Sequence, residues 1–243
     1  MHFALIGLLL AACGGSAALG TPAPATTAAA TVAATAAAAT ATVAPSTASP
    51  ATATPATTTA PSAGTWTVGA ASKAVVSVRE QLVGLSLPSD AVLTATGGTG
   101  TFALKADGTF SSDSKITFDL TTLTSDSRDR DNFVKQGTLQ TRQFPKAELA
   151  PTKTTGLRLP LASSGTFTFK LTGNLTIHGK TKEVSFDVVA KRNGSELSAT
   201  ATLAPSVNFG DFGMTPPTSS FRVLSIVDEI RLVVDIVATG DAA

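Results

Sequence analysis

The chain has 243 residues, and its 18 Lys and Arg and 17 Asp and Glu residues all lie between Lys73 and Asp241. The net charge of +1 argues against a nucleic-acid-binding protein, which normally carries a basic surface. A single Cys excludes an internal disulfide and a CxxC-type zinc or redox site, and two His residues leave little for His-based catalysis. Composition thus disfavours most classes of enzyme, and we do not expect an enzyme.

The first residues form an apolar segment with the length of a signal-peptide core. Residues 3–12 are apolar but too few to span a membrane as a helix. Small residues then precede Cys13, which resembles the bacterial lipoprotein box. We expect residues 1–12 to be a lipoprotein signal peptide and the Cys13 thiol to be acylated, which would anchor an extracytoplasmic protein to a membrane in the periplasm or at the outer cell surface. A Cys that merely follows an ordinary signal peptide is the alternative.

Residues 13–64 have the composition of a linker. They are almost wholly Ala, Thr, Pro, Ser and Gly, and they offer no bulky side chain whose burial could offset the entropy of ordering. We expect this segment to be disordered. It is either a tether that holds the following domain away from the envelope or a spacer of no particular length.

From Trp66 onward the sequence alternates between apolar and polar residues. In residues 166–178 the odd positions are Phe, Leu, Ile or Gly and the even positions are polar, which predicts a strand with one dry face. Thirteen residues make a strand long enough to require a bend, and Gly173 lies on its inner face, where a bend would crowd a side chain. Long bent strands are typical of closed barrels.

Similar alternation predicts further strands joined by short turns, in the order of an antiparallel meander. The last strand places Leu224, Ile226, Ile230, Leu232, Val234 and Ile236 on one face. The predicted strands are residues 74–82, 92–95, 101–106, 115–123, 147–150, 166–178, 180–191, 197–203 and 223–239.

One charged segment does not alternate, and its acidic and hydroxyl residues suit a helix N-terminus. We predict one short helix over about residues 127–138. Asp126, Asp129 and Asp131 could suggest a cation site, but Arg128 and Arg130 interleave with them, which favours a capped, salt-bridged helix start. No metal site is expected.

In this order and spacing, several short motifs resemble those of the YceI family, a family of secreted or periplasmic lipocalin-like proteins that bind polyisoprenoid lipids. They are Arg130-Asp131, Phe144-Pro145, residues 173–182 (GNLTIHGKTK) and Asp211-Phe212-Gly213-Met214. The resemblance implies an all-β domain over residues 65–243, an eight-stranded antiparallel lipocalin-like barrel. It also implies an apolar lumen that holds an isoprenoid chain, a polyprenyl or quinone tail, for transport, storage or stress response; no other cofactor is expected.

The apolar faces of the predicted strands supply the candidate lumen residues. Their alternative role is plain core packing, in a solid-core surface module that acts through protein–protein contacts. The candidates are Val76, Val78, Glu80, Phe102, Phe118, Phe167, Phe169, Leu171, Phe186, Val188, Ile230 and Leu232.

Four polar or aromatic residues allow two interpretations each. By the alternation of their strands, Glu80 and Asp228 fall on the same face as inward-facing apolar residues. They could anchor the polar head of a ligand, or they could reach solvent. His178 falls at a predicted hairpin turn, where we expect it to be solvated, although it could serve a hydrolase with an unrecognised triad. Trp66 is either a plug for one barrel end or an ordinary core aromatic.

Overall fold

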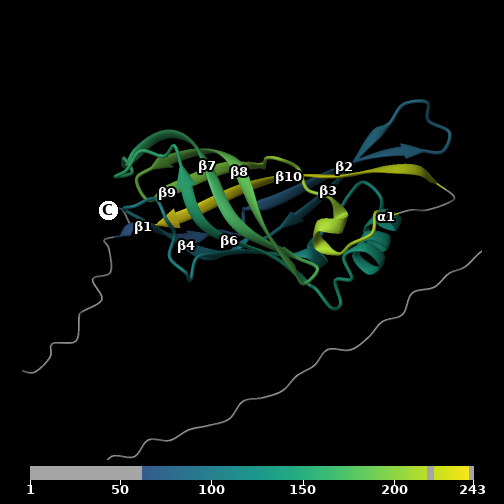
Figure 1. The fold of residues 1–243 in the computed structure, drawn as a ribbon, viewed down its shortest axis with the longest axis horizontal. Helices are drawn as coiled ribbons and strands as arrows, with labels where there is room; N and C mark the ends of the chain where they lie inside the picture. Colours follow the sequence, from purple (N-terminus) through teal and green to yellow (C-terminus); the bar gives the residue numbers. More distant parts are fainter. Residues whose placement is uncertain (1–61, 218–221, 241–243) are drawn as a thin grey trace, which may run out of the picture. The chain divides into compact units, whose positions relative to one another are not determined.

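The structure, a computed structural model, describes residues 62–217 and 222–240 and is built almost wholly from antiparallel strands (Figure 1). Cys13, the predicted signal peptide and nearly all of the predicted linker lie outside the described residues. The short helical segments are η1 (Leu120–Thr122), α1 (Arg128–Phe133), η2 (Val134–Thr138) and η3 (Phe209–Phe212). The strands are β1 (Ser62–Val68), β2 (Lys73–Leu82), β3 (Ser89–Thr96), β4 (Thr99–Lys105), β5 (Lys115–Asp119), β6 (Lys146–Thr155), β7 (Ser164–Ile177), β8 (Lys180–Asn193), β9 (Glu196–Leu203) and β10 (Val223–Gly240).

Eight of these strands close into a ring. The sheet runs in the order β1-β4-β5-β6-β7-β8-β9-β10, and β10 pairs back with β1. Strand β2 of the β2–β3 hairpin pairs with β10 from Val223 to Asp235, while β1 pairs with its last residues, Ala238–Gly240. The prediction of an eight-stranded antiparallel barrel with one short helix is confirmed, and the β2–β3 hairpin extends the wall at one end.

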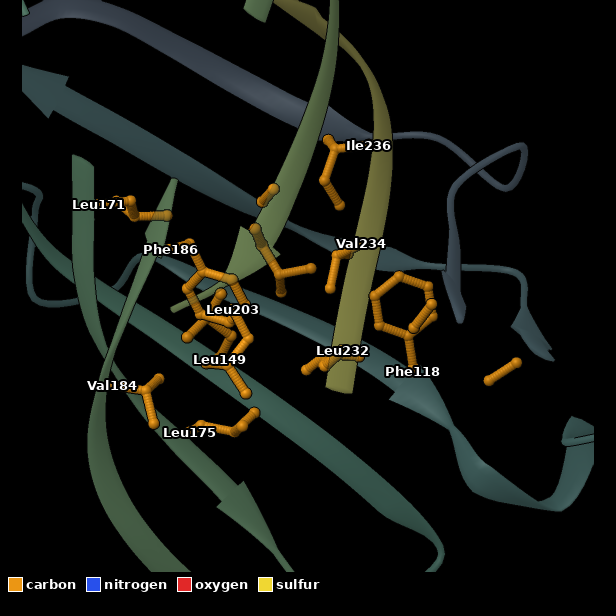
Figure 2. Packing of buried hydrophobic residues seen from close by; sticks show 14 of the residues in the cluster. Phe118, Leu149, Leu171, Leu175, Val184, Phe186, Leu203, Leu232, Val234 and Ile236 are labelled. Carbon is orange, nitrogen blue, oxygen red and sulfur yellow. The ribbon is translucent and has the colours of Figure 1, made fainter. Parts of the chain in front are cut away.

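The inward-facing residues of the alternating strands form a hydrophobic core inside the barrel. Phe186 of β8 is fully buried, and Figure 2 shows it close to Leu149 of β6 and Leu203 of β9, with Val234 of β10 further along the interior. Each such side chain contributes about 1.5–3 kcal/mol when it leaves water. The core therefore holds the strands together over the middle of the barrel.

The β7–β8 hairpin turns on two residues, His178 and Gly179, whose φ angles are +51° and +70°. Two consecutive positive φ values define the tight turn that matches strand twist. The ring of His178 packs against Phe144, with the ring centres 4.5 Å apart, and its Nδ1 lies 3.3 Å from the carbonyl oxygen of Phe212. The expectation of a solvated His178 is therefore wrong, because the aromatic side chain of Phe144 covers it.

Gly173 lies on the buried face of β7, where a side chain would be crowded, as predicted. A Cβ atom at this position would come within 2.9 Å of the carbonyl oxygen of Ala150 on β6. The β6–β7 register also shifts nearby, between Pro151 and Lys153. A side chain larger than hydrogen would thus push the two strands apart where the barrel wall curves.

The predicted helix over residues 127–138 is confirmed as α1 followed by the π-helical turn η2. Ser127 caps it by accepting a hydrogen bond from the Arg130 backbone N–H. Asp126 pairs with Arg130, and Oδ1 of Asp131 accepts hydrogen bonds from the backbone N–H and the hydroxyl of Ser125. These contacts confirm a capped, salt-bridged helix start.

Three details of the strand prediction are wrong. The strand predicted over residues 115–123 ends at Asp119, because the Asp119 side chain accepts from the Thr121 backbone N–H and begins η1. Leu224 is 65% exposed and does not share the inner face of β10, which pairs irregularly with β2 between Val223 and Ser225. Strand β1 was not predicted.

Among the described residues, none of the helices has the length and apolar character needed to cross a membrane.

Candidate ligand-binding site

A cavity of about 740 Å³ occupies the barrel interior beneath α1 and η3. Its walls are largely apolar, and its floor includes Phe186. Val83, Phe133 and Arg222 are exposed at the surface and also line the cavity, so it opens between them. The barrel interior is therefore not closely packed around this cavity. A volume of this size lies within the range of sites that hold small molecules.

A second, much smaller cavity of about 90 Å³ lies toward the opposite end of the barrel, next to Trp66. Ile116, Leu149 and Val234 line both cavities. These three side chains therefore form part of the partition between them. In the part of the chain that the structure describes, the interior thus holds a wide chamber and, further along the barrel, a narrow one.

All twelve residues predicted to line a lumen do line one of the two cavities. Their role in binding a ligand stays a prediction. The larger cavity is lined by Val76, Val78, Glu80, Phe118, Phe186, Ile230 and Leu232, and the smaller one by Phe102, Phe167, Phe169, Leu171 and Val188.

Near the opening, the wall of the larger cavity carries an ion pair. Glu80 on β2 is 5% exposed, and its Oε1 accepts from Nη2 of Arg130 on α1 at 2.8 Å. Nη1 of Arg130 pairs with the exposed Asp126. A carboxylate is rarely buried without such a partner, because desolvation of an unpaired charge is costly. Glu80 therefore points inward, which is one of the two orientations that the sequence left open, and Arg130 compensates its charge.

The partner of Glu80 was missed because it lies fifty residues away in the sequence. Strand parity shows which way a residue faces, but not which loop or helix folds over it. The Arg130-Asp131 motif was the available signal, since it lies in the one helical segment of a β-domain. Here Arg130 lines the cavity, and Asp131 fixes the loop before the helix by accepting a hydrogen bond from the Ser125 backbone N–H.

Asp228 does not point inward, and this interpretation is wrong. It is exposed, and its Oδ1 accepts from the backbone N–H of Phe209. The β10–β2 register shifts between Ile226 and Ile230, so β10 bulges here and simple alternation fails. Asp228 thereby holds η3 to β10 from outside the cavity.

The narrow end of the barrel is closed by Trp66 and Arg192. Trp66 is 1% exposed and Arg192 is 2% exposed, and the guanidinium carbon lies 4.9 Å from the centre of the Trp66 ring. Nε of Arg192 donates to the carbonyl oxygen of Gly194, and its Nη1 lies within hydrogen-bond distance of the carbonyls of Leu161 and Ala162. The position of Trp66 fits a residue that closes one barrel end.

The Asp211-Phe212-Gly213-Met214 motif holds η3 in place at the wall of the wide cavity, which Phe209 and Met214 line. Phe212 is fully buried, and Gly213 ends the turn with a φ of +65°. Oδ2 of Asp211 lies 2.6 Å from Nζ of Lys182 and accepts from the backbone N–H of Asn208. The hydrogen bond from Lys182 and then that from Asn208 lower the pKa of Asp211 below its ordinary value.

Eight-stranded barrels whose interior has room for one small ligand form a recognised class, which includes the lipocalins. Within this class, the chain belongs to the YceI-like family, because residues 66–238 match the model of the YceI-like domain. Two UPF0312 proteins of Pseudomonas putida, from strains F1 and KT2440, are each 32% identical over 137 residues. The match covers 49% of this chain and 66% of each relative's length.

Two solved structures have a similar fold. One is a polyisoprenoid binding domain from Saccharophagus degradans implicated in plant cell wall breakdown, with 10% identity and a TM-score of 0.54 over 72% of this chain and 97% of that one. The other is BcnA of Burkholderia cenocepacia, with 17% identity and a TM-score of 0.50 over 69% of this chain and 96% of that one. At these identities the similarity concerns the fold.

Proposed function

We propose that this protein binds one isoprenoid-type lipid, such as a polyprenyl or quinone tail, in the wide cavity of its barrel, and that it catalyses no reaction. The observation that carries this proposal is the largely apolar cavity of about 740 Å³ with the Glu80–Arg130 ion pair in its wall near the opening. An apolar chain would lie along Val78, Phe118 and Phe186, with its head toward the ion pair. The polyisoprenoid binding domain of similar fold supports the same ligand class.

The cavity volume sets the length of chain that fits. A water molecule takes about 30 Å³ in the liquid, so the cavity corresponds to about 25 waters. A carbon with its hydrogens displaces a similar volume, which makes about 25 carbons, or five isoprene units, the expected capacity. Burial of each methylene contributes about 0.8 kcal/mol, so binding would rest on apolar area more than on polar contacts.

The rim of the opening supports exchange of this lipid with a membrane. Exposed apolar side chains gather on the β2–β3 turn, on α1 and on the first part of β10, around the opening. A lipid could pass from the bilayer to the cavity along this rim without entering water. We define the apolar rim as Val83, Leu85, Leu87, Phe133, Leu224 and Val227.

The sequence supports a finer proposal for location. Acylation of Cys13 would anchor the protein to an extracytoplasmic membrane surface, and residues 14–64 would link the anchor to the barrel. The role would be lipid transport, storage or stress response at that surface. If Cys13 is acylated, the Cys13→Ser variant is expected to leave the membrane fraction, and a variant that stays membrane-bound would contradict this anchor.

The direct test is mass spectrometry of an organic extract of the protein purified from its own envelope. We expect a lipid with an isoprenoid chain in near-stoichiometric amount. Ala91 of β3 lines the cavity and the neighbouring Val92 faces solvent, so Ala91→Phe should remove the bound lipid while the matched control Val92→Phe keeps it.

A second arm covers the case in which Ala91→Phe fails to fold. Geranylgeraniol added to the delipidated protein should stabilise it by mass action, by about 2.7 kcal/mol at a concentration one hundred times Kd. A clean extract together with no stabilisation would overturn the proposal and favour a module that acts through protein contacts.

A further inference from the structure

The Glu80–Arg130 ion pair at the opening of the wide cavity supports an inference about the polar head of the ligand. This inference rests on the proposed function. Arg130 and Glu80 lie in the cavity wall between the apolar chamber and the surface. A lipid that enters with its chain toward Phe186 leaves its head beside this pair. The charges around the pair therefore decide which heads are accepted.

All Lys and Arg residues of the chain lie in the described ranges, so the cations that line the cavity can be named. They are Arg130 and Arg222. Arg130 donates to Glu80 through Nη2 at 2.8 Å and pairs with Asp126 through Nη1. Nη1 of Arg222 lies 3.7 Å from Oδ2 of Asp129. Both guanidinium groups thus have carboxylate partners before any ligand arrives.

In these ion pairs three carboxylates, Glu80, Asp126 and Asp129, share two guanidinium groups, so the paired groups together carry a net negative charge. A phosphate carries about −1.5 to −2 charges at pH 7. To reach Arg130 it would have to displace a carboxylate or lie beside two of them, and repulsion between like charges at such a contact is costly. The opening is therefore unfavourable for an anionic head.

An uncharged head avoids this repulsion. A guanidinium group has five N–H donors in a fixed plane, and contacts to two carboxylates leave others for an oxygen acceptor in the cavity. We infer that the cavity selects lipids with an uncharged, oxygen-bearing head, an alcohol or a carbonyl, over the same chain carrying a phosphate. Glu80 and Asp126 set this specificity through their hold on Arg130.

The test compares two probes with one chain and different heads, geranylgeraniol and geranylgeranyl phosphate. Binding to the delipidated full-length protein is measured by titration calorimetry at neutral pH. We expect the alcohol to bind about tenfold more tightly or better, because a modest like-charge repulsion has this effect on a dissociation constant. Equal binding of the two probes, or tighter binding of the phosphate, would overturn the inference.

Variants then locate the cause. Glu80→Gln removes one negative charge with little change in shape, and we expect the preference for the alcohol to fall several-fold, chiefly through tighter binding of the phosphate. Asp126→Asn should act in the same direction, and because Asp126 is exposed it keeps the test open if Glu80→Gln does not fold. The matched control is Asp187→Asn, which removes an exposed carboxylate paired with Lys170 on the outer wall.

The outcomes separate this inference from the proposed function. If the control Asp187→Asn shifts the preference for the alcohol as much as Asp126→Asn does, the preference comes from the net charge of the protein. That result would overturn the role of the Glu80–Arg130 ion pair. Binding of neither probe to the wild type would overturn the proposed function itself. Binding of both with the phosphate preferred would leave lipid binding intact and overturn only the selection of an uncharged head.

Discussion

Each end of the barrel has an arginine next to a cavity, but the two arginines have different partners and different exposure. At the narrow end Arg192 is held by backbone carbonyls and lies against Trp66, next to a cavity of only about 90 Å³. At the wide end Arg130 is held by carboxylates and lies in the wall of a cavity of about 740 Å³. The narrow end is thus a closed end held by neutral carbonyl groups, and the wide end is an entrance whose arginine is held by charged carboxylates.

This difference extends to the surrounding side chains. Trp66, Leu104 and Leu197 around the narrow end are buried, whereas the apolar rim of the wide end is exposed. Exposed apolar side chains contribute little to folding, and a contiguous group of them usually serves binding. Stability should therefore concentrate at the narrow end and ligand exchange at the wide end.

The largest expected effect is on folding, from removal of the Trp66 side chain. Trp66→Ala should lower the free energy of unfolding by about 3–5 kcal/mol, because it leaves a large cavity beside an existing one and removes the ring beneath Arg192. Phe133→Ala at the rim should change it by less than about 0.5 kcal/mol. Urea denaturation of the delipidated variants measures both. Equal losses would contradict the assignment of stability to the narrow end.

The next largest effect is expected from removing the Leu149 side chain, which separates the two cavities. Leu149 lines both cavities, so Leu149→Ala should join them, at a cost of about 2–5 kcal/mol in stability. The longest prenyl alcohol that binds tightly should then increase by about one isoprene unit, which titration with a series of chain lengths would show. Leu203→Ala is the control, since Leu203 lines only the larger cavity among the described residues. An unchanged length preference would mean that other side chains end the chamber.

The sequence predicted what depends on local pattern. Alternation placed Phe186, Val188 and Leu171 inside, and the family motifs gave the number of strands in the ring. The sequence did not show that the interior is divided into two cavities, because the space left inside a barrel depends on how side chains from distant strands pack together. Nor did it pair Glu80 with Arg130, since that contact depends on the path of a helix between two strands. Asp228 was misplaced for a related reason, because a bulge cancels the parity rule.

A smaller effect is expected on transfer rates. Leu87 is 78% exposed on the β2–β3 turn, so Leu87→Ser should leave stability within about 0.5 kcal/mol of the wild type. It should slow the uptake of a fluorescent prenyl alcohol from lipid vesicles several-fold while leaving the affinity at equilibrium unchanged. Val189→Ser, at an exposed position on β8, is the matched control. If both variants transfer at the wild-type rate, the apolar rim does not contact the vesicle.

The smallest expected effect is on the pH dependence of local stability. It should differ between the two ends of the barrel, because a carboxylate contributes to one end and neutral carbonyl groups to the other. The pKa of Asp211 is lowered by its hydrogen bond from Lys182, so the stability it contributes is present above its ordinary value of 3.8 and is lost as the pH falls through the lower value in the folded protein. The contacts of Arg192 are to carbonyls, which do not titrate. Hydrogen exchange should therefore show that acid loosens η3 and the β7–β8 turn before it loosens β1. Asp211→Asn should remove much of this selectivity, since its side chain no longer titrates. If β1 and η3 lose protection together as the pH falls, the ends do not differ in this respect.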